Sequence, residues 1–254
     1  MSFPRPFDIA TGSAHGWRSV KVDGRATNVA QAYVPVSAGL IYRTPQPSGA
    51  VNLRVRAGGN ANDTAAGSGA RSITIYGLDA NGLEISETVA TAGASASAAT
   101  AQQFIRMTEA RVASSGTYAT QAAGSHAGDI VIEDTGGNAW GTIVLNGFPE
   151  GVSRIGAYTI PANYEAFLIG FRINADTGKT CDAMVFKRSG ILDTAPPYQP
   201  MEAIVEVFNA TGFTDLGYDA PIYLPPLTDI GVLAKVDVQT ARVGVGLGLL
   251  MRRI

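Results

Sequence analysis

Apolar side chains alternate with small or polar ones along the last stretch of the sequence, residues 230–251. This period of two predicts β-strands with one buried face and does not fit the 3.6-residue period of an amphipathic helix. In the second strand the intervening residues are glycines, and such a flat face could accept another strand or subunit. The first predicted strand buries Ile230, Val232, Ala234, Val236 and Val238; the second buries Val243, Val245, Leu247, Leu249 and Met251, with Gly244, Gly246 and Gly248 between them.

Glycine is abundant along the whole chain, with 30 glycines in 254 residues. A helical protein would need long stretches without glycine, so we predict an all-β protein. Short strand-like segments recur over residues 50–148 and begin again beyond residue 151. The expected architecture is therefore two β-sandwich or jelly-roll-like domains, residues 46–150 and 151–254.

The N-terminal segment, residues 1–45, differs from the rest because it has little sustained periodicity. Proline fixes φ and removes a backbone donor, so we predict an extended arm that docks on its own domain or on a neighbour. A flexible tail is the alternative. The prolines behind this prediction are Pro4, Pro6, Pro35 and Pro45, with Pro47 just beyond.

The segment SITIYGLDANGLEISETV, residues 72–89, predicts a β-hairpin. Ile73 and Ile75 alternate with polar residues, and the following Asp-Ala-Asn-Gly, residues 79–82, contains residues that tolerate the positive φ of tight turns. The alanine-rich ATAGASASAATA, residues 90–101, is predicted to be a loop, because its glycine, serines and threonines oppose a helix.

Composition disfavours several classes of function. Charged residues make up only 16% of the chain and the net charge is −2, so no cluster of cations is available for a nucleic-acid backbone. The single cysteine, Cys181, cannot form an internal disulfide, which is compatible with assembly in a reducing cytoplasm. No apolar run is long enough for a signal peptide or a membrane span.

No motif in the sequence predicts catalysis, a cofactor or a bound metal. His15 and His126 lack a recognisable partner pattern, so both are expected to be surface residues. ADTGKT, residues 175–180, resembles the end of a phosphate-binding loop, but Ile173 occupies the position of the required first glycine. We therefore expect a hairpin turn there, and we expect Cys181 to be a small, partly buried core residue.

Four aromatic residues leave two interpretations open. They could form a platform on which a sugar stacks, or they could pack in the core and at interfaces, which we favour. A common solvent-facing surface would favour a binding module, whereas burial would favour a structural protein. The four are Trp17, Trp140, Tyr198 and Tyr223.

Two long segments carry a resemblance to a known group of proteins. GARSITIYGLDANGLEISETVATAG, residues 69–93, is followed by FIRMTEARVASSGTYATQAAGSHAGDIVIED, residues 104–134. Together they resemble virion structural proteins of tailed bacteriophages, in which a strand ending in Gly-Leu-Asp and a strand with Glu-Thr precede a Phe-Ile-Arg strand. The resemblance extends in outline over residues 28–250.

The resemblance implies a non-enzymatic component of a tailed-phage virion that is assembled in the host cytoplasm. The favoured role is a trimeric decoration, or cement, protein on the head, with copies of itself and the major capsid protein as partners. A tail or neck component and a receptor- or glycan-binding module at the virion surface are the alternatives. The residues themselves predict no catalytic, cofactor-binding or metal-binding site, and no nucleic-acid or membrane partner.

Overall fold

The computed structural model describes residues 4–43, 49–117, 124–145, 150–176, 178–237 and 240–254. Within these residues the chain forms fifteen strands, one short α-helix and one 3-10 turn, and all the strand pairs are antiparallel. The all-β prediction is therefore confirmed. No helix in the described part of the chain has the length and apolar character needed to cross a membrane.

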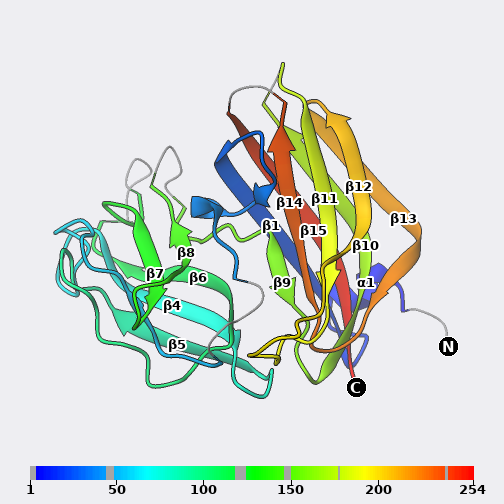
Figure 1. Ribbon diagram of the computed structural model, residues 1–254. Coiled ribbons are helices and arrows are strands. Elements are labelled where there is room, and N and C mark those ends of the chain that lie inside the picture. Colours follow the sequence, from blue (N-terminus) through cyan, green and yellow to red (C-terminus); the bar gives the residue numbers. More distant parts are fainter. Residues whose placement is uncertain (1–3, 44–48, 118–123, 146–149, 177, 238–239) are drawn as a thin grey trace. The chain divides into compact units, whose positions relative to one another are not determined.

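Two compact units make up the structure, and Figure 1 shows the strands of each. Unit 1 comprises Met1–Val36, Gly156–Ile191 and Gln199–Ile254, and unit 2 comprises Ser37–Ile155 and Leu192–Tyr198. Unit 2 is thus inserted into the sequence of unit 1. The predicted boundary at residue 151 lies close to the point where the chain re-enters unit 1.

Residues 17–29 of the predicted arm, residues 1–45, are extended and docked on the same chain, but they are a regular strand of unit 1 rather than a separate arm, because they pair along their length with the C-terminal strand. Val22 and Ala26 are buried on one face of this strand and alternate with charged residues. The alternation of apolar and charged residues is thus present in this strand, but it is weak because only small or medium apolar residues carry it.

In the chain before this strand, Pro6 is the first residue of helix α1, where its missing N–H costs no hydrogen bond. Residues 1–3 and 44–45 of the predicted arm lie outside the described residues.

The described residues of unit 1 form nine strands in two sheets, arranged as a jelly roll. One sheet, called sheet A, has the strand order β1-β15-β10-β13, and the other, sheet B, has the order β12-β11-β14-β2, with the short β9 also paired to β14. If β9 is left out and the other eight strands are numbered along the chain, the orders are 1-8-3-6 and 5-4-7-2, which is a double Greek key. The elements of unit 1 are α1 Pro6–Ala10, β1 Trp17–Val29, β2 Val34–Pro35, β9 Ala157–Thr159, β10 Tyr164–Ala175, β11 Cys181–Arg188, β12 Glu202–Ala210, β13 Phe213–Leu224, β14 Asp229–Val236 and β15 Ala241–Arg253.

The core of unit 1 follows the alternation predicted from the sequence. The predicted apolar faces of β14 and β15 are buried, from Ile230 to Val236 and from Val243 to Met251, and Val238 lies outside the described residues. In sheet B the buried residues of β14 stand beside buried residues of β11; Val185, for example, lies opposite Val232. The burial of these regular faces is the main stabilising contribution that the sequence predicts.

The segment in which the chain leaves unit 1 and the segment in which it returns contact each other very closely through their backbones. Gly156 donates its N–H to the carbonyl oxygen of Val36 at 3.0 Å, and both residues lie against Gly24 of β1. A Cβ atom on Gly24 would lie 2.3 Å from that oxygen and 2.4 Å from the Cα of Gly156. Only glycine permits this approach, because any side chain would overlap backbone atoms.

Unit 2 holds two three-stranded sheets, ordered β3-β7-β8 and β5-β4-β6. The predicted hairpin is confirmed as β4 and β5, and Asp79 accepts hydrogen bonds in its turn from the N–H groups of Asn81 (2.8 Å) and Leu83 (2.9 Å). Residues 91–101 of the predicted loop, residues 90–101, form no regular strand or helix, as expected, whereas Ala90 is the last residue of β5. The elements of unit 2 are the 3-10 turn η1 Ala38–Leu40, β3 Leu53–Val55, β4 Ala70–Leu78, β5 Glu84–Ala90, β6 Arg106–Ser115, β7 Ile130–Asp134 and β8 Ala139–Ile143.

Candidate functional site

Two of the four aromatic residues named from the sequence lie on the same face of sheet A. Trp17 of β1 stands opposite Arg252 of β15, and Tyr223 of β13 stands opposite Phe167 of β10. In β15, Arg252 follows the fully buried Met251, so this set of side chains points away from the core. We call Trp17, Phe167 and Tyr223 the aromatic row.

The other two aromatic residues lie elsewhere. Trp140 is 3% exposed in β8 of unit 2, and Tyr198 lies in a loop of unit 2 with its hydroxyl 3.4 Å from the carbonyl oxygen of Thr194. A platform made of all four residues is therefore not formed. The structure supports core packing for Trp140 and a common surface for Trp17 and Tyr223.

The rings of the aromatic row pack against one another. The centroids of Trp17 and Phe167 are 5.8 Å apart with an interplanar angle of 25°, and those of Phe167 and Tyr223 are 5.7 Å apart at 50°. The guanidinium carbon of Arg252 lies 5.7 Å from the centroid of the Trp17 ring. Trp17 and Phe167 use their ring faces for these contacts. Tyr223 is the most exposed residue of the row, with 50% of its surface accessible.

An ion pair between a buried carboxylate and a half-buried arginine supports the aromatic row. Glu165 is 8% exposed and forms an ion pair with Arg252, across from it in the sheet. Burial raises the pKa of the Tyr223 hydroxyl, and the negative charge and hydrogen bond of Glu165 raise it further. The tyrosine is thus kept as a neutral donor toward Glu165. Such a surface, rich in Trp, Tyr and Arg, has the composition of the residues that dominate binding energy at protein interfaces.

The glycine stripe predicted on β15 lies on the same outer face but is only partly open. Gly244 would carry a Cβ with Gly24 O, at 4.0 Å, as its nearest neighbour, whereas a Cβ on Gly246 would lie 3.3 Å from Nε of Arg172 and 3.4 Å from Oδ1 of Asp23. Side chains of the flanking strands β10 and β1 therefore lie over Gly246. The sequence pattern identified the face correctly but could not show these neighbours.

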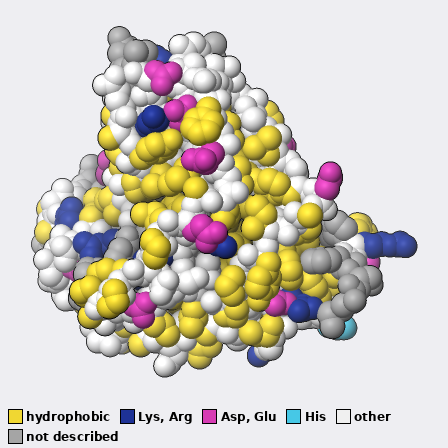
Figure 2. Space-filling view, turned by 45° about the vertical axis from the view of Figure 1, so that its right-hand side comes forward, with side chains coloured by type: hydrophobic (Ala, Val, Ile, Leu, Met, Phe, Trp, Pro, Cys, Tyr) yellow, Lys and Arg dark blue, Asp and Glu magenta, His cyan; other side chains and the backbone are white. Residues whose placement is uncertain are grey.

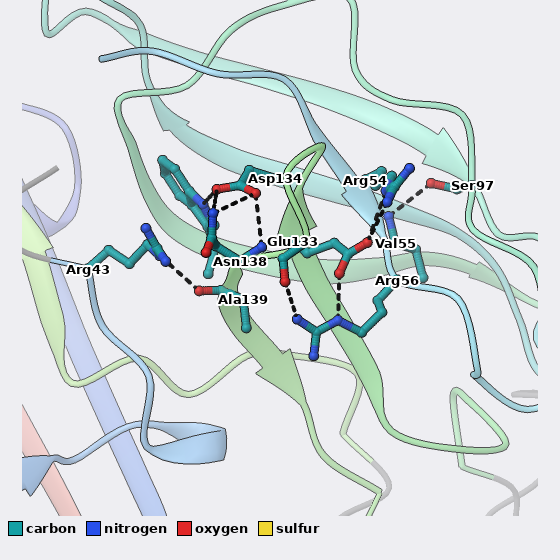
Figure 3. A network of polar contacts seen from close by, with 11 residues as sticks. Arg43, Arg54, Val55, Arg56, Ser97, Glu133, Asp134, Asn138 and Ala139 are labelled. Atoms are coloured by element: carbon teal, nitrogen blue, oxygen red, sulfur yellow. Dashed lines mark hydrogen bonds and ion pairs between the residues drawn. The ribbon is translucent and has the colours of Figure 1, made fainter. Parts of the chain in front are cut away.

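A network of polar contacts in unit 2 surrounds Glu133, which is 4% exposed (Figure 3). Its carboxylate accepts hydrogen bonds from Nε of Arg54 at 3.0 Å and from Nε of Arg56 at 2.5 Å. Burial alone would raise the pKa of Glu133, but the hydrogen bonds and charges of these two arginines outweigh it and hold the pKa below its ordinary value. The network ties β3 to β7.

The neighbouring Asp134 closes the β7–β8 turn in the same network. Its Oδ1 accepts the N–H of Asn138 at 2.9 Å, and its Oδ2 accepts the indole N–H of Trp140 at 3.3 Å. Arg56 also donates to the carbonyl oxygen of Gly137 at 2.8 Å, and Arg43 donates to that of Ala139 at 3.1 Å. Both carboxylates are engaged by the protein itself, so we assign the network a structural role.

His126 corrects a prediction made from the sequence. We expected a surface residue, but the side chain is 4% exposed, and its Nδ1 lies 2.8 Å from Oγ of Ser125. Burial lowers the pKa of His126, while Asp63, a hydrogen bond to the backbone of Val144 and Asp129 act in the opposite direction. Asp63 holds the same loop by accepting the N–H groups of Ala70, Ala127 and Gly128 at 2.7–3.0 Å. The burial of His126 depends on tertiary contacts, because the sequence of its own loop contains no apolar pattern that would predict it.

The free energy of unfolding should fall as the pH drops below about 6.5, the ordinary pKa of histidine. The unfolded chain binds a proton on His126 in this range, whereas the native state binds it only at its lower pKa, so stability rises with pH through this window. Urea unfolding at a series of pH values measures the effect. His126→Gln should reduce the slope, and the control His15→Gln, at an exposed position, should preserve it. Equal slopes for the wild type and His126→Gln would contradict the assignment.

The remaining residues named from the sequence carry no site. His15 is exposed, and Cys181 is fully buried, with burial raising the pKa of its thiol to about 11. The ADTGKT segment lies between β10 and β11, in the place expected for a turn, with Thr177 outside the described residues. Within the described ranges, no group of three or more His, Cys, Asp or Glu side chains is arranged to hold a metal ion.

Three residues of the aromatic face were missed by the sequence analysis. Glu165 and Phe167 both lie on β10, whereas Arg252 lies on β15, far away in the chain, and only the registers of β10 with β13 and β15 bring these residues beside Tyr223 and Trp17. Hydrophobic periodicity predicts which face of a strand a residue occupies, but it does not give the pairing of strands.

No family model matches the chain, and no curated protein matches it. Solved structures with some likeness include the infectious bursal disease virus Gx strain, at 10% identity and a TM-score of 0.25, covering 93% of this chain and 71% of that one. T=1 particles derived from the same virus match at 11% identity and a TM-score of 0.22, covering 94% and 74%. At these scores the likeness carries no argument about either fold or function.

Proposed function

We propose that this protein is a non-enzymatic structural component of a tailed-phage virion, most specifically a trimeric decoration protein of the head. The observation that carries the proposal is the jelly-roll order of unit 1, with a second β unit inserted between its second and third strands. Jelly rolls recur in viral capsid domains and in lectins. This support is an analogy of fold, which by itself specifies no function.

The sequence resemblance adds the tailed-phage context. The segments that carry it form β4 to β7 of unit 2, so they correspond to regular elements of the structure. The proposed partners are copies of the same chain and the major capsid protein. The proposed location is the virion, after assembly in the host cytoplasm.

A glycan- or receptor-binding module at the virion surface is the second candidate, because Trp17 and Tyr223 share the outer face of sheet A. The half-exposed ring of Tyr223 could stack on a sugar, with Glu165 and Arg252 beside it. The mutual stacking of Trp17 and Phe167 reduces the ring area available for this purpose. We therefore rank this candidate second.

The number of copies in purified phage particles tests the proposal. A head decoration protein should be present in large numbers spread over the capsid surface, as counted by quantitative mass spectrometry and located by electron cryomicroscopy. A few copies confined to the tail or neck would contradict the head assignment. Complete absence from particles would overturn the virion role.

The glycan-binding candidate needs its own variant. Tyr223→Ala removes the exposed ring, while Tyr76→Ala removes a ring that is 38% exposed on β4 of unit 2 and serves as the control. Loss of glycan-array binding in the first variant alone, with normal copy number in particles, would favour the binding module. Unchanged array signals in both variants would remove it.

A further inference from the structure

The two edges of the jelly roll carry opposite charge. Residues 202–224, which form the adjacent edge strands β12 and β13, contain four acidic residues and no lysine or arginine. Residues 17–29, which form the opposite edge strand β1, contain three basic residues and one acidic residue. We call these the acidic edge and the basic edge. The acidic residues are Glu202, Glu206, Asp215 and Asp219; the basic ones are Arg18, Lys21 and Arg25.

The charges of the acidic edge are largely unneutralised by the protein itself. Glu202 pairs with Lys187 at 3.2 Å, but among the described residues no ion pair is formed by the exposed Glu206, Asp215 or Asp219. Arg172 stands opposite Asp215 in the sheet, yet its guanidinium lies over Gly246 of β15 on the other side. A partner with positive charge would therefore find free carboxylates here.

Exposed aromatic side chains lie on the same two strands as the acidic residues. Phe208 and Phe213 flank the tight connection between β12 and β13 and are 62% and 66% exposed. Figure 2, turned toward this side of unit 1, shows hydrophobic side chains gathered over a broad area with acidic groups among them. Exposed aromatic rings surrounded by polar groups are typical of protein contact surfaces.

The acidic edge is not built for direct addition of a strand. Residues 218–221 of β13, which include Pro221, bulge away from β10 between Gly217 and Ile222, and β12 has two register shifts against β11. Bulges, proline and charge on edge strands are the usual protection against strand addition. A partner would therefore be held by side chains, through the carboxylates and the two phenylalanines.

The basic edge offers the matching chemistry. In the described part of the chain β1 pairs only with β15, and the side chain of Lys21 is 60% exposed. Lys21 lies 3.3 Å from Asp23, the single acid of the strand. Since β13 and β1 are the two edge strands of sheet A, and β12 is the edge strand of sheet B that precedes β13 in the chain, contact between the acidic and basic edges of two copies leaves one edge free on each copy. A contact of this type closes into a ring when its rotation permits.

We propose that the acidic edge of one copy binds the basic edge of a second copy, with Glu206 and Asp215 facing Lys21 and Arg25. This inference adds to the proposed function the contact that would hold a trimer together. It rests on the proposed function only for the number of copies in the ring. The partner is a second copy, and the contact is head to tail.

Charge exchange on the full-length chain tests the contact. Glu206→Lys with Asp215→Lys, and separately Lys21→Glu with Arg25→Glu, should each weaken self-association roughly tenfold or more, as measured by sedimentation velocity at low salt. The variant that combines all four substitutions should associate like the wild type, because the charges are exchanged rather than lost. Equimolar mixing of the two double variants should also restore assembly.

The control is Glu84→Lys on β5, the exposed edge strand of a sheet in unit 2, which should leave association unchanged. Circular dichroism confirms that each variant is folded. Folded reversal variants that associate normally, or a folded fourfold variant that stays monomeric, would overturn the proposal. A wild-type chain that is monomeric at every concentration would also overturn it.

These outcomes are separable from those of the proposed function. A monomeric chain found in large numbers on phage heads would refute the contact and leave the virion role intact. Charge-dependent assembly of a chain that is absent from particles would do the opposite.

Discussion

We expect Val236→Asp to prevent folding of unit 1. Val236 is 1% exposed at the end of β14, stands opposite the fully buried Cys181, and donates its N–H to the carbonyl oxygen of Ala30 at 2.9 Å. A carboxylate placed there loses its hydration, which costs roughly several kcal/mol even when protonation relieves the charge. A typical domain is stable by only about 5–15 kcal/mol, so this loss removes most of the margin.

The measurement is far-ultraviolet circular dichroism combined with urea unfolding. Leu233→Asp is the matched control, since Leu233 lies half-buried on the outer face of the same strand, where a carboxylate can reach water. That variant should fold with a smaller loss of stability. A folded Val236→Asp chain with an unchanged midpoint would show that the inner face of β14 has been misassigned.

The second large effect is expected for Gly24→Ala. The new Cβ would lie 2.3 Å from the carbonyl oxygen of Val36 and 2.4 Å from the Cα of Gly156, and both of these neighbours are backbone atoms that cannot rotate away. Overpacking in a tight site typically costs about 1–3 kcal/mol, and contact with backbone places this substitution at or above the upper end. Urea unfolding should show this loss.

Gly217→Ala on β13 is the matched control for this substitution. A Cβ at Gly217 would have nothing within 4 Å, so the added methyl group meets open space. Alanine also restricts the unfolded chain, so this variant should be unchanged or more stable by about 0.4–1 kcal/mol. Equal stability of the Gly24→Ala variant and the wild type would mean that the contact with Val36 and Gly156 is looser than described.

The candidate site was only partly predictable. The outward position of Trp17 and Tyr223 became evident only once β1 and β13 were found in the same sheet, and the opposite charges of the two edges depend on the same strand order. His126 shows the converse case: it lies in a sequence rich in glycine, alanine and serine, yet it is buried in unit 2, near Asp63 and the backbone of Val144. Such placements depend on contacts between distant segments, which local patterns do not encode.

The sequence by itself determined the all-β class, the hairpin of residues 72–89 and the buried faces of β14 and β15. These features are local, since turn residues and a period of two act on neighbouring positions of the chain. Only the tertiary structure decided that residues 17–29 are a strand rather than an arm and that unit 2 interrupts a jelly roll. The partner of β1 is β15, at the other end of the chain, and the choice among possible strand pairings depends on how all the buried faces fit together.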